Sequence, residues 1–352
     1  MLPIIFGLQG FSVNDAERAF FHACNPFGFI LFRRNIDTPE QVKTLVAELR
    51  AIVGRDDAPI LIDQEGGRVQ RLRPPHWVDL PNAQSIGALY DKNPVAGLKA
   101  SALQARVISG MLTELGIDVD CAPVMDLPVQ GAHDVIGDRA FANDADAVID
   151  LSVAMGQAFL AHGVMPIMKH IPGHGRAMSD SHYECPVVHD DMATLEQTDF
   201  SIFKQAAAKI GAEKLWSMTA HVVFTALDDA PVSVSKKAID YLRHDLGISG
   251  PIIPDAIEME ALGGTLAERA IATLNAGCDA VLHCSGNLDD MQSIAAQLPQ
   301  MTHTSRMRFE QAAAARAATS TIDWRADYAA LAAMLDIKIA DDYQSHEALT
   351  IA

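Results

Sequence analysis

The sequence has little of what several large protein classes require. Lysine and arginine together number 27 against 45 acidic residues, so the formal net charge is −18 at pH 7. Nucleic-acid surfaces and contacts with anionic membranes need clustered basic side chains, and no such cluster is present, so we expect neither partner. No apolar run is long enough to span a bilayer. Hydrophobic residues nevertheless make up 49% of the chain, which is enough for a large core.

Cysteine is also scarce. The five cysteines are irregularly spaced and contain no CxxC pair: Cys24, Cys121, Cys185, Cys278 and Cys284. This usage favours a reduced, cytoplasmic location and gives no signature of a cysteine nucleophile. Residues 1–8 are apolar but lack a basic segment and a small-residue cleavage site, so we interpret them as a strand and not as a signal peptide.

Apolar runs of strand length alternate with longer amphipathic segments. The predicted strands are residues 2–8, 28–32, 59–63, 117–124, 164–168, 215–224, 251–253 and 279–284. The predicted helices include residues 95–115, 144–162, 190–210, 235–246 and 265–276, and further helical segments follow at 287–296, 304–317 and from about 324. Thr38 and Pro39 predict the start of another helix, and Gly54 its end.

Eight strands that alternate with helices predict a single (β/α)8 barrel over residues 1–352, with extra helices at the C-terminal end. The rival fold is a doubly wound open sheet. That fold would require a glycine-rich phosphate loop, and no GxGxxG follows the first strand.

In a barrel of this kind the carboxyl ends of the strands line the active site. This rule selects polar residues at six predicted strand ends: Asp63, Asp126, Lys169, His170, His221, Asp255 and His283. Asp255 is a candidate nucleophile, because a positioned carboxylate can attack an anomeric carbon; the alternative is a carboxylate that caps the next segment. Asp63 could accept hydrogen bonds from ligand hydroxyls. Four cationic groups could bind other polar parts of a ligand, or form structural ion pairs: Arg71, Arg139, Lys169 and His170.

The loop after the fifth predicted strand is the richest in chemistry. Residues 169–182 contain three histidines, a lysine, an arginine and an aspartate, and their proline and glycines exclude a regular helix. In an extended segment Asp180 and His182 would project to the same side, so Asp180 could orient His182 and raise its pKa. Such a pair is a candidate general acid and base. The alternative is a surface turn in which Asp180 acts as a cap.

The same histidines also raise a zinc hypothesis. His170 and His174 are four residues apart, but Pro172 and Gly173 break the helix that would align them. We therefore expect no metal and no other cofactor.

Several segments together resemble one enzyme family. Residues 61–71, 122–126, 137–141, 169–182, 218–221 and 255–260 are similar to the bacterial β-N-acetylglucosaminidases of glycoside hydrolase family 3. These segments extend over most of the chain, from about residue 27 to residue 284. The combination of Lys-His-x-Pro-Gly-His-Gly with a following Asp-Ser-His is highly specific.

The resemblance implies a single barrel, without the additional C-terminal domain of longer relatives, and a retaining two-step hydrolysis. It implies that Asp255 is the nucleophile and that His182, paired with Asp180, is the general acid and then the base. The implied sugar-binding residues are Asp63, Arg71, Arg139, Lys169 and His170. The implied substrate is N-acetylglucosamine β-1,4-linked to anhydro-N-acetylmuramic acid, with or without a stem peptide, in cytoplasmic cell-wall recycling. We expect a monomer whose partner is this small muropeptide.

One segment departs from the family pattern. The family has Ser/Thr-Asp-Asp-Leu at the nucleophile, whereas this chain has Pro254, Asp255, Ala256 and Ile257. Pro254 removes a backbone donor, and Ala256 removes a carboxylate that could orient its neighbours. Two alternatives therefore stay open beside the hydrolase: a non-catalytic sugar-binding protein, and a related glycosidase or phosphorylase.

Overall fold

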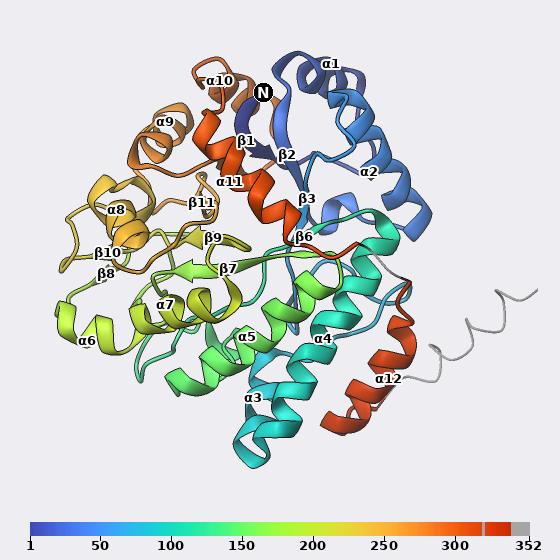
Figure 1. Cartoon of the computed structure of the whole chain (residues 1–352). Helices are drawn as coiled ribbons and strands as arrows, with labels where there is room; N and C mark the ends of the chain where they lie inside the picture. Colours follow the sequence, from blue (N-terminus) through green and yellow to red (C-terminus); the bar gives the residue numbers. More distant parts are fainter. Residues whose placement is uncertain (319–320, 339–352) are drawn as a thin grey trace, which may run out of the picture.

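The computed structural model describes residues 1–318 and 321–338 (Figure 1). Within this part, eight parallel strands form one sheet in the order β11-β9-β7-β6-β3-β2-β1-β12. The strands are β1 (Leu2–Phe6), β2 (Pro26–Leu31), β3 (Ile60–Ile62), β6 (Val119–Asp120), β7 (Met165–Ile171), β9 (Trp216–Thr219), β11 (Ile252–Pro254) and β12 (Val281–His283). The end strands meet where the Asp279 N–H donates to the Ile252 carbonyl at 2.7 Å and the Ile257 N–H to the Leu282 carbonyl at 3.0 Å. The predicted barrel is confirmed.

Helices cover the outside of the barrel (Figure 1). They are α1 (Asp15–Cys24), α2 (Pro39–Val53), α3 (Ala83–Lys92), α4 (Pro94–Leu115), α5 (Ala145–Ala161), α6 (Met192–Gln197), α7 (Asp199–Ile210), α8 (Lys236–His244), α9 (Leu266–Ala276), α10 (Leu288–Ala295), α11 (His303–Ala314) and α12 (Trp324–Leu335). Short strands pair outside the barrel: β4 (Gln64–Gly66) with β5 (Val69–Gln70), and β8 (Val187–Val188) with β10 (Val223–Phe224).

Local sequence signals explain where α2 begins and ends. The Thr38 side chain accepts a hydrogen bond from the Gln41 N–H at 3.2 Å, and Pro39 is the first helical residue. Gly54 ends the helix with a φ of 63°, a left-handed conformation that glycine adopts without a steric cost.

Three elements differ from the sequence prediction. The helix expected over residues 190–210 is two helices, α6 and α7, because Thr198 lies between them with non-helical angles (φ −121°, ψ −101°). The strand expected at 215–224 is likewise divided into β9 and β10, and α3 was not predicted. β9 remains in the barrel sheet, and the strand order of the barrel is unchanged.

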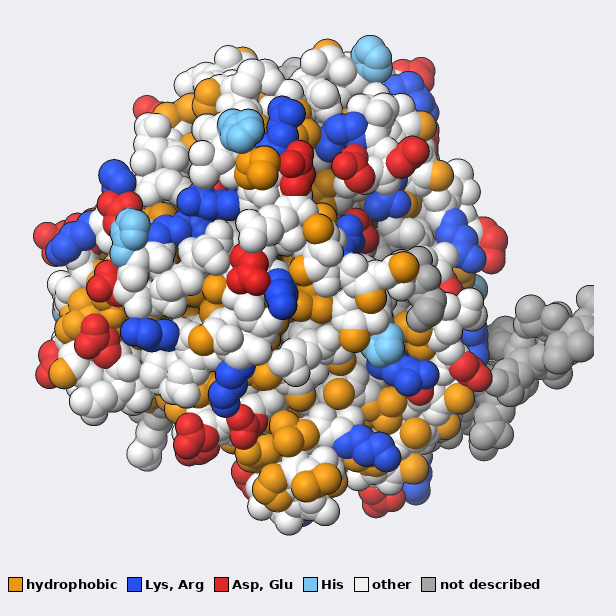
Figure 2. All heavy atoms as spheres, in the orientation of Figure 1, with side chains coloured by type: hydrophobic (Ala, Val, Ile, Leu, Met, Phe, Trp, Pro, Cys, Tyr) orange, Lys and Arg blue, Asp and Glu red, His pale blue; other side chains and the backbone are white. Residues whose placement is uncertain are grey.

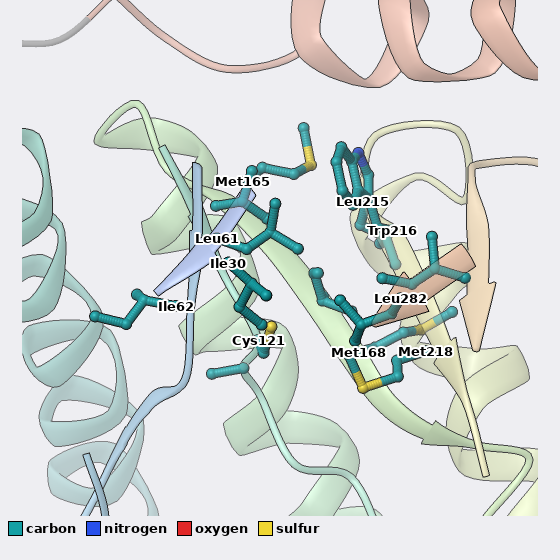
Figure 3. Close-up of a cluster of buried hydrophobic side chains, with 14 of the residues drawn as sticks. Ile30, Leu61, Ile62, Cys121, Met165, Met168, Leu215, Trp216, Met218 and Leu282 are labelled. Carbon is teal, nitrogen blue, oxygen red and sulfur yellow. The ribbon is translucent and has the colours of Figure 1, made fainter. Parts of the chain in front are cut away.

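The inside of the barrel is filled with apolar side chains (Figure 3). Ile30, Leu61, Met168, Met218 and Leu282 come from five different strands and are all buried. Such layers make a barrel interior a packed core and not a pore.

Helix α11 lies across the amino-terminal end of the barrel (Figure 1). Its Phe309 ring is 4.2 Å from the Phe27 ring and 4.7 Å from the Trp216 ring, measured between centroids. Acidic and basic side chains are interspersed on this face, and the basic ones do not gather into one field (Figure 2). No helix in the described ranges is long and apolar enough to cross a membrane. With this end covered, the opposite end is the one available for a site.

Candidate active site

A cavity of about 420 Å³ lies at the carboxyl end of the barrel strands. Its lining comes from the ends of β2, β3, β7, β9, β11 and β12 and from the loops that follow the barrel strands. Of the eight residues with an implied catalytic or sugar-binding role, seven line it: Asp63, Arg71, Arg139, Lys169, His170, His182 and Asp255. The eighth, Asp180, contacts His182. A smaller hollow of about 100 Å³ lies beneath α11 at the other end, where none of these residues is found.

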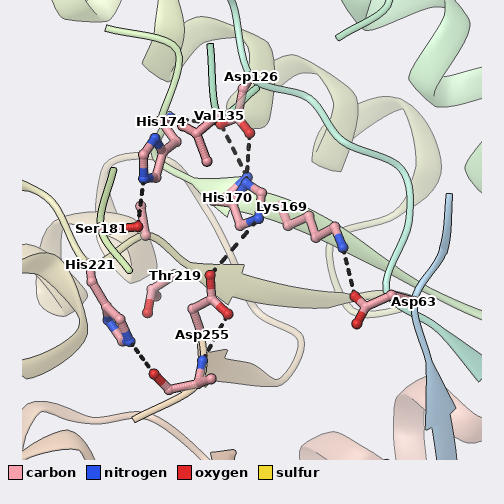
Figure 4. A network of polar contacts seen from close by, with 12 residues as sticks. Asp63, Asp126, Val135, Lys169, His170, His174, Ser181, Thr219, His221 and Asp255 are labelled. Atoms are coloured by element: carbon pink, nitrogen blue, oxygen red, sulfur yellow. Dashed lines mark hydrogen bonds and ion pairs between the residues drawn. The ribbon is translucent and has the colours of Figure 1, made fainter. Parts of the chain in front are cut away.

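One wall of the cavity is a cluster of paired charges (Figure 4 draws its Lys169–Asp63 contact). Lys169 Nζ lies 3.0 Å from Asp63 Oδ1 and 2.6 Å from Glu65 Oε1. Arg71 Nη2 donates to Asp63 Oδ2 at 2.9 Å. Arg139 binds Glu65 with two hydrogen bonds, of 2.9 and 2.8 Å. We call these five residues the charge cluster.

The charge cluster fixes its own ionisation. Burial alone would raise the pKa of the Asp63 and Glu65 carboxyls, but Lys169 and the two arginines outweigh burial and hold both pKa values below the ordinary range. The same carboxylates raise the pKa of Lys169, against the effect of its burial. All five groups are therefore charged near neutral pH. They present oriented, charged donors and acceptors, which form the strongest hydrogen bonds to hydroxyl groups.

His170 stands between the charge cluster and the candidate nucleophile. Its Nδ1 lies 2.7 Å from Asp126 Oδ2, and its Nε2 lies 4.0 Å from Asp255 Oδ2 (Figure 4). The pairing of β7 with β9 is irregular between Lys169 and Ile171. This irregularity accounts for two consecutive side chains, Lys169 and His170, lining one cavity, since neighbours in a regular strand point to opposite faces.

Asp255 comes directly after β11, as the sequence predicted. Its own N–H donates to the Thr219 carbonyl at 3.1 Å, and its Oδ1 accepts from the Ala256 N–H at 2.8 Å. Burial would raise the pKa of Asp255, but the His170 and His221 rings outweigh burial and lower it. Asp255 is thus an oriented carboxylate that is ionised at neutral pH, as a nucleophile must be.

Asp180 and His182 interact as predicted, although the backbone differs from the prediction. The Asp180 Oδ1 atom lies 2.6 Å from His182 Nδ1 and also accepts from the His182 N–H at 2.9 Å. The segment is a turn and not an extended strand, because Asp180 folds over the backbone of His182. Burial would raise the pKa of Asp180, but these hydrogen bonds lower it, so the carboxylate is charged. His182 Nε2 has no hydrogen-bond partner in the described part of the chain and is open to a ligand.

Glu65, which joins Lys169 to Arg139, was not predicted from the sequence. A signal was available, because Glu65 lies two residues after the strand-end Asp63 and within one of the matched segments. The three histidines of the zinc hypothesis have separate partners: Asp126, Ser181 and Asp180. Over residues 1–318 and 321–338 no group of three or more potential ligands could hold a metal ion.

Known proteins are similar over most of the chain. Residues 8–318 match the family model described as glycosyl hydrolase family 3 N terminal domain. A beta-hexosaminidase of Chromobacterium violaceum is 38% identical over 287 residues, 80% of this chain and 78% of that protein. A beta-hexosaminidase of Alkalilimnicola ehrlichii is 35% identical over 311 residues, 87% of each chain. The crystal structure of native NagZ from Neisseria gonorrhoeae superposes with a TM-score of 0.84 at 31% identity, covering 95% of this chain and 97% of that one.

Enzymes with a parallel barrel have their active sites at the carboxyl ends of the strands, which is where the charged groups gather in this chain. The matched family identifies the enzyme as a glycoside hydrolase. The chain belongs to glycosyl hydrolase family 3.

Proposed function

We propose that the chain is an exo-acting, retaining β-N-acetylglucosaminidase. The observation that carries the proposal is that one cavity is lined by the ionised Asp255, by His182 with its partner Asp180, and by the charge cluster. The similarity to proteins named beta-hexosaminidase and NagZ supports the same activity.

The first step is the transfer of the terminal sugar to the enzyme. An Asp255 oxygen attacks C1 of the sugar while protonated His182 donates its Nε2 proton to the glycosidic oxygen. The C1–O bond breaks, the leaving group departs as an alcohol, and the sugar is held as an ester of Asp255. Asp180 engages Nδ1, which leaves Nε2 as the nitrogen that exchanges the proton.

The second step is hydrolysis of the ester. Neutral His182 takes a proton from a water molecule, and the water oxygen attacks C1 from the side that the leaving group vacated. The bond to Asp255 breaks, the carboxylate returns, and the released sugar keeps the β configuration. Five residues hold the sugar hydroxyls through both steps: Asp63, Arg71, Arg139, Lys169 and His170.

The altered residues beside the nucleophile are compatible with catalysis. Ala256 acts through its backbone: its N–H donates to Asp255, and its carbonyl accepts from His221 Nε2 at 2.9 Å. Pro254 is paired with Thr219 in the barrel sheet, so it fits the end of a strand. Neither contact needs the side chains that the family pattern has at these two positions.

We also propose the biological substrate, N-acetylglucosamine β-1,4-linked to anhydro-N-acetylmuramic acid, with or without a stem peptide, cleaved in the cytoplasm by a monomer. The five unpaired cysteines support a reducing compartment. Analytical ultracentrifugation of the purified chain tests whether the protein is a monomer in solution.

The test of the activity is hydrolysis of 4-nitrophenyl N-acetyl-β-D-glucosaminide by the purified chain, with and without phosphate. We expect nitrophenol release that does not depend on phosphate, and proton NMR should detect the β-anomer of the sugar first. A requirement for phosphate would identify a phosphorylase. Binding of N-acetylglucosamine in calorimetry without turnover would identify a sugar-binding protein. First appearance of the α-anomer would contradict the retaining mechanism.

A further inference from the structure

A buried contact joins the loop of the proposed acid and base to the polar network beneath it. His174 Nε2 and Ser181 Oγ lie 2.9 Å apart (Figure 4), and both residues are almost completely buried. We infer that His174 and Ser181 are positioning residues that set His182 against the glycosidic bond. This inference rests on the proposed function and gives a role in the same site to two residues whose role neither the sequence motifs nor the comparisons assign.

His174 is itself held firmly. Its backbone N–H donates to Asp126 Oδ1 at 2.6 Å. Burial, together with the nearby His170, lowers the pKa of its ring to about 4, so the ring is neutral near pH 7 and its bond to Ser181 does not depend on charge. Its Nδ1 atom is buried and has no hydrogen-bond partner among the residues that the structure describes. Within residues 1–318 and 321–338, Ser181 is therefore the hydrogen-bond partner of this ring.

Ser181 lies between Asp180 and His182, with its side chain directed inward. Its carbonyl accepts from the Ala261 N–H at 3.3 Å, and the carbonyl of His182 accepts from the Glu260 N–H at 3.4 Å. Both bonds are at the long end of the normal range. The His182 side chain, in contrast, is 59% exposed. The shorter bond from Ser181 to His174 is consequently the main side-chain anchor of this turn.

A chain of contacts connects the His174–Ser181 bond to the proposed nucleophile, Asp255. Asp126 binds the backbone of His174 with Oδ1 and the ring of His170 with Oδ2, and His170 Nε2 faces Asp255. One buried carboxylate thus orients both the ring beside the nucleophile and the ring that anchors the acid and base. The rate of proton transfer falls steeply when the donor or acceptor moves by about 1 Å. Loss of the anchor should therefore lower the rate of the step in which His182 transfers a proton.

Leaving groups of different basicity distinguish this role from a general structural one. Nitrophenol departs with little help from an acid, whereas a sugar alcohol departs only when it is protonated. In Ser181→Ala we expect kcat/KM for the disaccharide with anhydro-N-acetylmuramic acid to fall by about tenfold or more, and kcat/KM for the nitrophenyl glycoside to change by less than about twofold.

Ser179→Ala is the matched control. It makes the same chemical change in the same loop, and the Ser179 side chain has no hydrogen bond within the described residues. It should resemble the unmodified enzyme on both substrates. His174→Gln, whose amide can reach Ser181 in place of Nε2, should keep more activity on the disaccharide than His174→Ala.

A double-mutant cycle completes the test. If Ser181 acts through His182, adding Ser181→Ala to His182→Ala should cause no further loss on the disaccharide. Equal losses on both substrates, or an additive loss in the double mutant, would overturn the positioning role while leaving the proposed function intact. Absence of hydrolysis by the unmodified chain would overturn the proposed function and this inference with it.

Discussion

The two halves of the site are built in different ways. Asp63, Lys169 and His170 lie at barrel strand ends. The charge cluster as a whole is largely buried and is held together by several short contacts. His182 lies in an irregular loop, and most of its side chain is exposed. In the proposed mechanism the paired groups of the charge cluster are held in place before the sugar binds, whereas the acid must lie at the open side of the cavity, next to the leaving group. If the proposed roles hold, sugar binding depends on the rigid barrel and proton transfer depends on a loop.

The largest effect should follow from removing the proposed nucleophile, Asp255. We expect Asp255→Ala to lower kcat by more than about 10⁴-fold, because no other group can form the ester. Nitrophenol release from the standard glycoside measures the loss. Asp229→Ala, which removes an exposed carboxylate, is the control. A near-normal rate for Asp255→Ala would remove this residue from the mechanism.

The next largest loss of activity should follow from substitution of His182 in the loop. We expect His182→Ala to lower kcat/KM for the disaccharide by about 10² to 10⁴-fold and to affect the nitrophenyl substrate much less. Added azide should raise kcat and yield the β-glycosyl azide, because azide attacks the ester without a base. If kcat/KM falls equally for both substrates and azide has no effect, His182 is not the acid and base.

A smaller effect on activity, and a clear one on stability, should result from breaking the charge cluster. Glu65→Gln removes one charge between Lys169 and Arg139, whose side chains are only 2% and 12% exposed. We expect KM to rise and the free energy of unfolding to fall by about 1–3 kcal/mol. Urea denaturation measures the stability. Glu260→Gln, on the exposed side of the nucleophile loop, should match the unmodified chain.

The smallest effect concerns a neutral acid below the cluster. Burial raises the pKa of Asp120 to about 8, far above that of the unfolded chain. Between about pH 4 and pH 8 the folded state thus binds one proton more than the unfolded state, so this group's contribution to stability decreases as pH rises. Asp120→Asn keeps an acceptor for the Gln64 N–H and should be more stable relative to the unmodified chain at pH 8 than at pH 5. Melting temperatures at the two values measure the difference, and parallel curves would contradict it.

Much of the fold could be predicted because the barrel strands are short apolar runs, and because helix caps such as Thr38 and Gly54 act locally. The division at Thr198 was not predictable, since the amphipathic pattern continues through it. Strand-end position together with the family motifs predicted seven residues of the cavity lining. Their catalytic and binding roles stay predictions.

Contacts between distant segments are what the sequence could not supply. Glu65 acquires its importance from Arg139 and Lys169, which are 74 and 104 residues away in the chain. The bond of His174 to Ser181 likewise requires the loop to fold back on itself. The contact between Asp180 and His182 was predicted correctly, although the predicted backbone conformation was wrong. Two residues spaced this closely can be in contact in a turn as well as in a strand.

The packed interior of the barrel has a consequence for turnover. Ile30, Met218 and Leu282 belong to the filled core (Figure 3). The same three residues line the cavity, so the cavity is closed at its base. In the proposed two-step mechanism, a bound sugar can leave only through the opening by which it entered. It can leave only after the leaving group has been released. The two products would accordingly be released in a fixed order, sugar last, and accumulated N-acetylglucosamine would compete directly with fresh substrate.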